Sequence, residues 1–358
     1  MSLLAKIHTE VAARGPMPFE RFMEQCLYDV EHGFFATGPL RSGKAGDFLT
    51  SPEVSPAFGR ALAGFVVAER ERIGAHRFVL AEVGAGSGSL LRSLLETMDP
   101  PPDGVFAVET SPAARAALAE IDEVTVLKEL EELPHLVRGV VVANELLDNL
   151  PVRLAVRTGG SWEERYVAQD GDGLRLVAAQ ARPDTVAWAD AFCGVVDEGG
   201  LVEVQLVGGE YVANLLGRLD AGAFVAFDYG GTAEELEPRR TRGTLRTYRA
   251  HHLGPDPLLE PGATDVTVDV NFTAMVAAAE AAGAQVELHR QDDFLAGQGL
   301  RDEIGELRSR ELVLANDPAA AMERLRLRSE RVDAETLLHP RGLGDFRVLV
   351  ARVGSPRA

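Results

Sequence analysis

A short glycine-rich loop constrains the fold of this chain more than any other feature of its sequence. The loop, Glu82-Val83-Gly84-Ala85-Gly86-Ser87-Gly88, follows an apolar run at 78–83 and precedes a helical pattern at 88–98. Glycines let a backbone turn tightly and approach a ligand because they carry no Cβ. The helix that follows presents free N–H groups to a polar ligand. The sequence therefore predicts a ligand-binding corner between a strand and a helix, with a corner of purely structural role as the alternative.

The segments after the loop continue as an alternation of short apolar runs and helices, which is typical of a parallel sheet. Further strands are expected at 104–108, 124–127, 139–143, 223–227, 285–289 and 346–353. The alternation stops after Pro151, where Gly turns separate β-rich runs. We expect an α/β, Rossmann-like fold with a mostly parallel sheet and inserted segments.

The distribution of helical and β-rich segments in the sequence divides the chain into an N-terminal extension and a core. Residues 1–75 are expected to form a mostly helical extension that includes a polar, Gly-rich loop at 33–53. Residues 76–358 are expected to form the core, with insertions at about 152–207 and 231–271 and a helical segment at about 291–332.

Charge and cysteine content exclude several classes of protein. The formal net charge is −19, which disfavours nucleic acid because phosphate binding draws on clustered Lys and Arg. No apolar run approaches the roughly 18 residues that a membrane helix needs, so we expect no membrane insertion. The two cysteines, Cys26 and Cys193, provide neither a disulfide framework nor a thiolate metal cluster, and we expect no metal. These features fit a cytoplasmic location, which we expect.

The glycine loop resembles motif I of class I methyltransferases. A nicotinamide fingerprint that begins at Gly84 would need glycine where Ser89 stands, which disfavours an oxidoreductase. S-adenosylmethionine carries a sulfonium and an ammonium, so a carboxylate at Glu82 suits its methionine end. Glu109 follows the loop by about 20 residues, the spacing of a carboxylate that binds ribose hydroxyls. The expected cofactor-binding residues are Glu82, Gly84, Gly86, Gly88, Glu109, Glu129, Leu130 and Asn144; a helix N-terminus remains the alternative role for Glu129.

Polar residues also gather at the end of the expected strand 139–143, in the segment 144–151. Catalytic groups in open α/β sheets lie at this edge. We expect Asn144, Glu145 and Asp148 to be catalytic, since a carboxylate can orient an amine or guanidinium and accept its proton. Glu145-Leu146-Leu147 differs from the Pro-Pro-aromatic motif of nucleobase N-methyltransferases. Helix N-terminal charge placement is the alternative for the two carboxylates.

Several motifs together resemble the MidA-like family, and the resemblance covers nearly the whole chain. Its marks are the residues Gly33-Phe34-Phe35, Gly46-Asp47-Phe48-Leu49-Thr50-Ser51-Pro52-Glu53, the glycine loop, Asn144-Glu145-Leu146-Leu147-Asp148-Asn149-Leu150-Pro151, Asp228-Tyr229-Gly230 and 262–272. The resemblance implies a class I methyltransferase core with an N-terminal helical extension. Its mitochondrial member is regarded as a protein arginine methyltransferase that acts on a subunit of respiratory complex I.

The resemblance also directs attention to a set of acceptor-binding residues of suitable chemistry. The expected substrate-binding residues are Asp47, Glu53, Asp228, Tyr229, Asp265 and Asp269. Carboxylates can pair with a guanidinium through two hydrogen bonds. The chain departs from the family at Ala85-Gly86-Ser87, where many members have Gly-Pro-Gly-Arg-Gly, and at Asn149, where the family has Ala.

The sequence thus predicts an S-adenosylmethionine-dependent methyltransferase whose acceptor is a protein arginine nitrogen. A subunit of respiratory complex I is the partner that the resemblance implies. A small-molecule N- or O-methyltransferase is the first alternative. A non-catalytic assembly factor with the same fold is the second, and failure to bind the cofactor would favour it.

Overall fold

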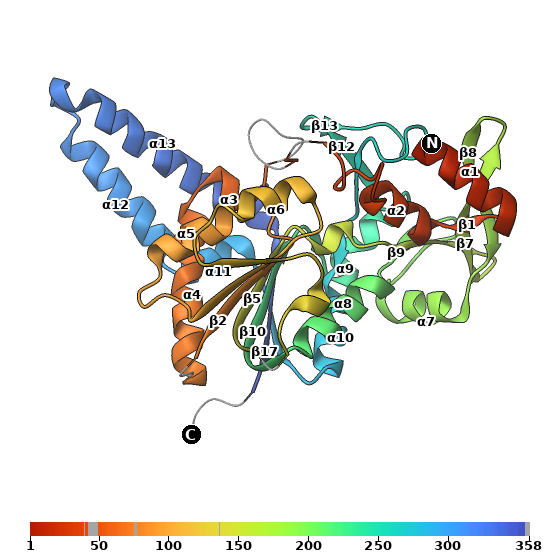
Figure 1. Cartoon of the computed structure of the whole chain (residues 1–358), viewed down its shortest axis with the longest axis horizontal. Helices are drawn as coiled ribbons and strands as arrows, with labels where there is room; N and C mark the ends of the chain where they lie inside the picture. Colours follow the sequence, from red (N-terminus) through yellow and green to blue (C-terminus); the bar gives the residue numbers. More distant parts are fainter. Residues whose placement is uncertain (39, 42–48, 75–76, 136, 355–358) are drawn as a thin grey trace.

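A seven-stranded, mostly parallel sheet forms the centre of the protein (Figure 1). The computed structural model describes residues 1–38, 40–41, 49–74, 77–135 and 137–354. The strand order is β16-β17-β10-β5-β2-β3-β4, and β17 runs antiparallel to both of its neighbours. The strands are β2 (Val79–Val83), β3 (Gly104–Val108), β4 (Val124–Leu127), β5 (Val137–Asn144), β10 (Leu219–Asp228), β16 (Gln285–Arg290) and β17 (Arg347–Val353).

Helices cover both faces of this sheet because its strands are apolar on both sides. In β5, Val140 and Val142 pack into one core and Val141 and Ala143 into the other, as the alternation of strand side chains requires. The helices that pack on the first face are α4 (Ala57–Ile73), α5 (Ser89–Thr97) and α11 (Gln291–Gly297); those on the second are α8 (Leu206–Leu216) and α10 (Phe272–Ala281). A parallel sheet buried on both faces is the arrangement that the sequence predicts.

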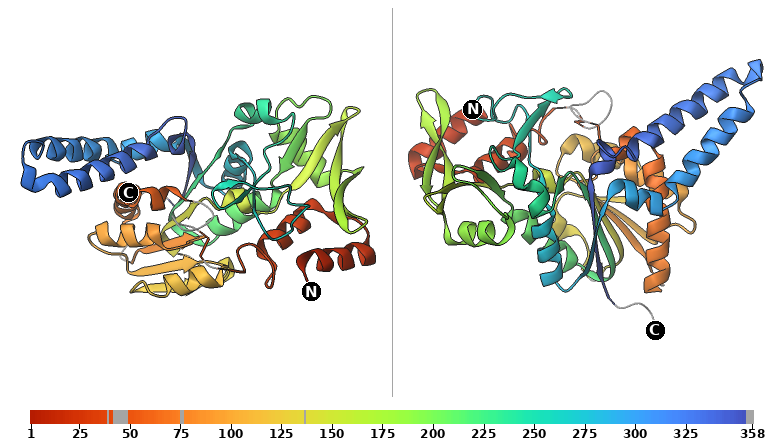
Figure 2. Two further views of the ribbon diagram at one scale, coloured as in Figure 1. Left: turned by 90° about the horizontal axis from the view of Figure 1, so that it is seen from above. Right: turned by 180° about the vertical axis from the view of Figure 1, so that it is seen from behind.

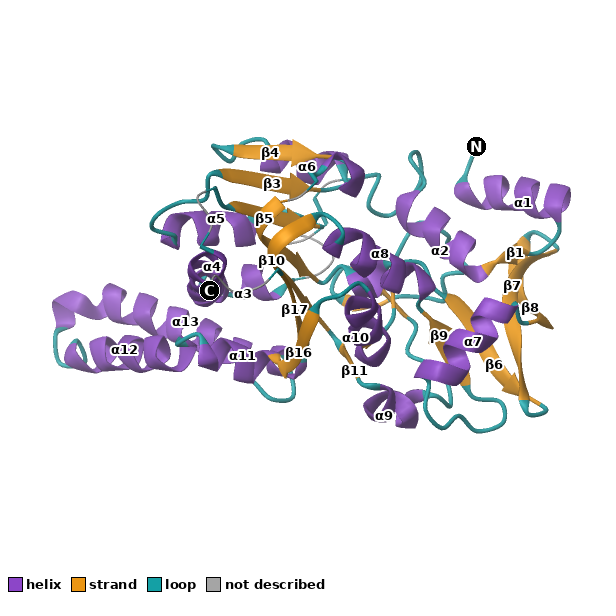
Figure 3. Ribbon diagram, turned by 90° about the horizontal axis from the view of Figure 1, so that it is seen from below, coloured by secondary structure: helices purple, strands orange, loops and turns teal. Residues whose placement is uncertain are grey.

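The first part of the N-terminal extension packs on the inserted region and not on the central sheet (Figure 3). Strand β1 (Met17–Pro18) pairs with β7 of a second sheet. That sheet contains β6 (Arg153–Thr158), β7 (Ser161–Asp170), β8 (Gly173–Gln180) and β9 (Leu201–Val204), and α7 (Pro183–Phe192) follows β8. A third core joins this sheet to α1 (Leu3–Arg14) and α2 (Phe19–Tyr28). Residues 1–28 and the insertion are therefore one structural layer, although residues 29–152 separate them in the sequence.

Two further segments complete the chain. Residues 230–271 form short strands and one turn of helix: β11 (Gly230–Gly231), α9 (Ala233–Leu236), β12 (Arg246–Arg249), β13 (His252–Leu253), β14 (Asp265–Thr267) and β15 (Val270–Asn271). Helices α12 (Leu300–Val313) and α13 (Ala321–Leu337) form a hairpin that stands away from the body (Figure 2). None of the described helices is long and apolar enough to cross a membrane.

Candidate functional site

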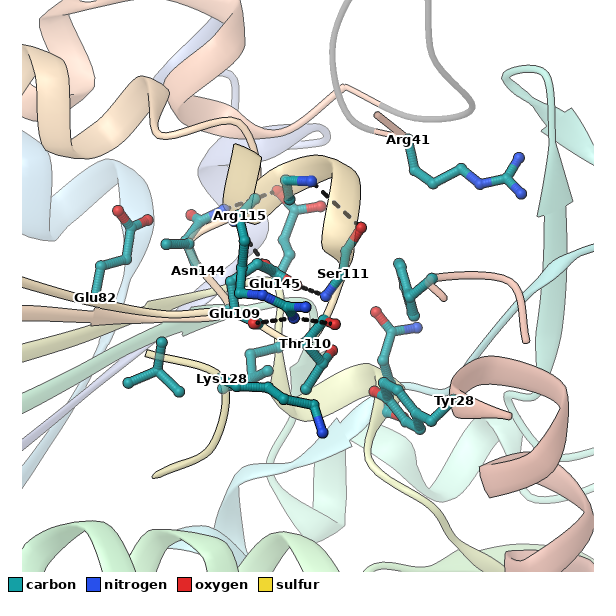
Figure 4. Close-up of a pocket in the computed structure, with 18 of the residues that line it drawn as sticks. Tyr28, Arg41, Glu82, Glu109, Thr110, Ser111, Arg115, Lys128, Asn144 and Glu145 are labelled. Carbon is teal, nitrogen blue, oxygen red and sulfur yellow. Dashed lines mark hydrogen bonds between the residues drawn. The ribbon is translucent and has the colours of Figure 1, made fainter. Parts of the chain in front are cut away.

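A pocket of about 620 Å³ opens at the carboxyl edge of the central sheet. Residues after β2, β3, β4 and β5 line one part of it, and residues of α2 and of α3 (Ser51–Val54) line another. Figure 4 shows Glu82, Glu109, Lys128, Asn144 and Glu145 around this space. The edge at which parallel strands end has thus brought together the segments that follow four strands, as expected for this class of sheet.

The glycine loop forms one wall of the pocket and is tied to the next strand. Gly86 has φ +51°, a left-handed conformation that favours glycine. Its N–H donates to Glu109 Oε2 at 2.9 Å, and the N–H of Ser111 donates to Glu109 Oε1 at 2.7 Å (Figure 4). Burial raises the pKa of Glu109, while these two N–H groups oppose the shift. Each oxygen keeps a second lone pair, so Glu109 can still accept hydrogen bonds from a ligand hydroxyl.

Two buried acceptor atoms in the pocket have no partner within the described part of the chain. They are Glu82 Oε2 and Asn144 Oδ1, in side chains that are 4% and 7% exposed. Burial raises the pKa of Glu82 well above 4.5, and the charge of Glu109 adds to the shift. A buried polar atom without a partner is costly, so a donor on a ligand is the expected complement. The ammonium of S-adenosylmethionine is such a donor, and the residues present therefore fit this cofactor.

Glu145 lies next to Asn144 and also lines the pocket. Its backbone has φ +49°, which is uncommon for a residue with a side chain. Its Oε1 accepts hydrogen bonds from the N–H of Ser51 and from Asn144 Nδ2, both at 3.3 Å. Burial, with a smaller contribution from the charge of Asp148, raises the pKa of Glu145 to about 8. The carboxyl is therefore close to its titration range at neutral pH, a property of general bases and acids.

Asp148 is not among the residues that line the pocket, and its catalytic role stays a prediction. It is 3% exposed, and its Oδ2 accepts hydrogen bonds from the hydroxyls of Tyr229 and Thr267. The chain after β5 turns away from the sheet edge at this point, so Glu145 and Asp148 have different surroundings. Asp148 acts on the pocket through its charge, which contributes to the raised pKa of Glu145.

The residues predicted to bind substrate differ in their surroundings. Asp228, Tyr229, Asp265 and Asp269 are not among the residues that line the pocket, and their contact with the acceptor stays a prediction. Asp228 Oδ2 accepts the N–H groups of residues 146, 147 and 148 at 2.9–3.2 Å and so fixes the turn that carries Glu145. Asp269 pairs with Arg239 and Arg246, and Asp265 accepts from Asn149 Nδ2 at 2.8 Å.

Of the remaining residues predicted to form the site, some line the pocket and others do not. Glu53, Gly84, Glu129 and Leu130 line the pocket. Gly88 does not, and a Cβ there would lie 2.6 Å from Ile121 Cδ1 and 2.9 Å from Leu118 Cδ2. Its role as a cofactor contact stays a prediction, and side chains of the next βα unit occupy the space beside it. Asp47 lies outside the described residues.

Some lining residues were not predicted from the sequence. Tyr28 reaches the pocket from α2, and its hydroxyl donates to the backbone carbonyl of Asn149 at 3.2 Å. Arg115 donates to the carbonyls of Glu109 and Thr110, and Tyr211 approaches from α8. No motif marks these residues, since their side chains reach the pocket only through the packing of distant helices. Ser87 could have been found, because it lies inside the glycine loop.

Comparison with known proteins agrees with this geometry. Residues 61–289 match the model of a family described as "Putative S-adenosyl-L-methionine-dependent methyltransferase". The human protein arginine methyltransferase NDUFAF7, mitochondrial, is 27% identical over 96% of this chain and 81% of its own length. The homologue from Drosophila melanogaster is 28% identical over 79% of this chain and 71% of its own.

A crystal structure from Burkholderia thailandensis is also similar over nearly the whole chain. That protein, described as a "COG1565 superfamily member and likely methyl transferase" bound to S-adenosyl-homocysteine, aligns with a TM-score of 0.86 and 30% identity. The match covers 99% of this chain and 93% of that one. The α/β methyltransferase fold and the cofactor expected from the sequence are thereby confirmed.

Proposed function

The chain belongs to the family of S-adenosylmethionine-dependent methyltransferases, and from this premise we propose that it methylates an arginine nitrogen of a protein. The observation that carries the proposal is the position of Glu145, a half-buried carboxyl beside Asn144 in the pocket. Among the described residues Glu145 has no cationic partner. A guanidinium supplies the positive charge and the paired donors that a buried carboxylate requires. The names of the relatives, protein arginine methyltransferases, support the same acceptor.

The residues of the pocket suggest how the two reactants are held. The cofactor supplies an electrophilic methyl group. Glu82 and Asn144 offer acceptors for its ammonium, and Glu109 offers acceptors for its ribose hydroxyls. Glu145 would pair with the guanidinium. A guanidinium nitrogen loses one proton when it gains a methyl group, and a carboxylate with a raised pKa in contact with it can accept that proton.

The test is transfer of tritiated methyl from S-adenosylmethionine to a peptide that contains Gly-Arg-Gly repeats. The control peptide has Lys in place of Arg. We expect label only in the arginine peptide, and we expect Glu145→Gln to reduce the rate by roughly 10²–10⁴-fold, the range for loss of a general base. Equal labelling of both peptides, or an unaffected Glu145→Gln variant, would contradict the proposal.

The same experiment separates the alternative acceptors. Free arginine and small amines are assayed beside the peptides, and label in these alone would support a small-molecule methyltransferase. Proteins of the host cell serve as a further acceptor pool, and a labelled subunit of respiratory complex I would identify the partner that the family resemblance implies. A cytoplasmic location also remains a proposal, and cell fractionation with antibody detection tests it.

A further inference from the structure

The short helix α3 contacts both parts of the pocket. Its Glu53 reaches the glycine loop, where Glu53 Oε1 accepts a hydrogen bond from Ser87 Oγ at 2.9 Å. Its Ser51 donates a backbone N–H to Glu145, as described above. Helix α3 belongs to the N-terminal extension, so a segment outside the parallel sheet makes direct contact with the loop that starts the cofactor site.

Both oxygens of the Glu53 carboxylate have a defined partner. Oε2 accepts hydrogen bonds from the N–H and the hydroxyl of Thr50, both at 3.1 Å, and closes a capping box at the start of α3. The other oxygen of Glu53, Oε1, faces the glycine loop and accepts the hydrogen bond from Ser87. The carboxylate therefore joins the first turn of α3 to Ser87, and its orientation is fixed from both ends.

Ser87 occupies a part of the glycine loop that has little other side-chain support. It lies between Gly86 and Gly88, which both have positive φ and no side chain. Among the described residues, the side chain of Ser87 bonds only to Glu53 and to Ser89 Oγ, at 2.9 Å each. Flexible glycines lose more conformational freedom on ordering than other residues do. An external contact that holds Ser87 lowers the entropy lost when the loop orders around a ligand.

We propose that Glu53 is a positioning residue of the cofactor site, which acts through Ser87 to hold the glycine loop in its binding conformation. The N-terminal extension then completes the cofactor site of the methyltransferase core. The substrate contact expected of Glu53 from the sequence stays a separate prediction, since Glu53 also lines the pocket. The positioning role concerns the cofactor and does not depend on the identity of the methyl acceptor.

The alternative is that Glu53 acts by charge alone. Its charge contributes to the raised pKa values of both Glu82 and Glu145, so it influences the electrostatic potential of the pocket. S-adenosylmethionine carries one more positive charge than S-adenosylhomocysteine. A purely electrostatic role would therefore weaken binding of the first ligand and spare the second, whereas a positioning role would weaken both.

The test is isothermal titration of both ligands into the full chain and its variants Glu53→Ala, Ser87→Ala and the double variant. We expect each single variant to raise the Kd of both ligands about tenfold, the scale of one hydrogen bond to a charged group. Because the two residues act through one contact, the double variant should lie within about twofold of the weaker single variant. Glu31→Ala, an exposed glutamate of the same extension that pairs with Lys6, is the matched control.

Three results would overturn the proposal: an unchanged Kd in Glu53→Ala, additive effects in the double variant, or weakened binding of S-adenosylmethionine alone. Circular dichroism checks that each variant is folded. If Glu53→Ala does not fold, Ser87→Ala carries the test, because it removes the same contact and leaves the capping box of Thr50 and Glu53 intact; an unchanged Kd in that variant would overturn the proposal. No binding of either ligand by the unaltered chain would also overturn it.

Discussion

At the scale of single residues, the glutamates of the pocket have the same side chain but different hydrogen-bond partners and pKa shifts. Glu109 accepts two backbone N–H groups, while Glu82 keeps one oxygen without a partner among the described residues. Glu53 is bound at both oxygens, and Glu145 carries a pKa of about 8. In the proposed site, one residue type would therefore serve as ribose acceptor, ammonium acceptor, loop support and proton acceptor.

The raised pKa of Glu145 gives a prediction about pH. Below about 8 the carboxyl is mostly protonated in the free protein, and above it the carboxyl is ionised and can accept a proton. Methyl transfer to the arginine peptide should therefore rise with pH and level off above a midpoint at or below 8, since bound cations favour the ionised form. The check is kcat/KM between pH 6 and 9.5, and Glu145→Gln should remove the rise. A flat profile in the unaltered chain would exclude Glu145 as the titrating group.

At the scale of elements, the conformation of the glycine loop depends on the helices beside it. Gly88 precedes α5 with φ +77°, and Leu118 and Ile121, at the end of and just after α6 (Pro112–Leu118), fill the space where a Cβ would point. A glycine that the sequence pattern assigns to the ligand is thus required by packing between two consecutive βα units. Close helix–strand packing is one of the established reasons for glycine in such loops.

Gly88→Ala should therefore lower the free energy of unfolding by about 1–3 kcal/mol, from backbone strain together with contact against Leu118 and Ile121. Gly171→Ala is the matched control, because Gly171 also has positive φ but its Cβ would meet nothing within 4 Å. Urea unfolding measures both. We expect the free energy of unfolding to fall more in Gly88→Ala than in Gly171→Ala. An equal decrease in the two variants would show that packing contributes nothing at Gly88.

At the scale of the whole molecule, two layers meet at the pocket. The central sheet supplies the loops that end its strands, and the layer of α1, α2 and the second sheet supplies Tyr28. This second layer has its own core, with Phe22, Met23 and Leu27 fully buried. The part of the pocket that Tyr28 lines thus depends on a core that the parallel sheet does not share.

Phe22→Ala should destabilise this second layer by about 3–5 kcal/mol, the range for a buried aromatic side chain replaced by alanine. Val195→Ala, at a side chain that is 72% exposed, should change the free energy of unfolding by less than about 0.5 kcal/mol. Urea unfolding with hydrogen exchange of residues 1–30 measures both effects. A Phe22→Ala loss as small as that of Val195→Ala would mean that this core contributes little to stability.

The sequence by itself determined the parallel sheet, the order of its βα units and the loop at its carboxyl edge. It could do so because strand length, apolar runs and glycine spacing are local properties. The sequence also predicted that Glu82 and Glu109 lie near that loop, because the ends of parallel strands always meet at one edge of a sheet.

Only the tertiary structure decided which other carboxylates face the pocket. Asp228 and Asp269 share their residue type with Glu145, but backbone N–H groups surround the first and two arginines the second. Pairing of β1 with β7 and contact of Glu53 with Ser87 likewise join segments that are distant in the sequence. Such contacts depend on how complete elements pack, and no local pattern of residues records them.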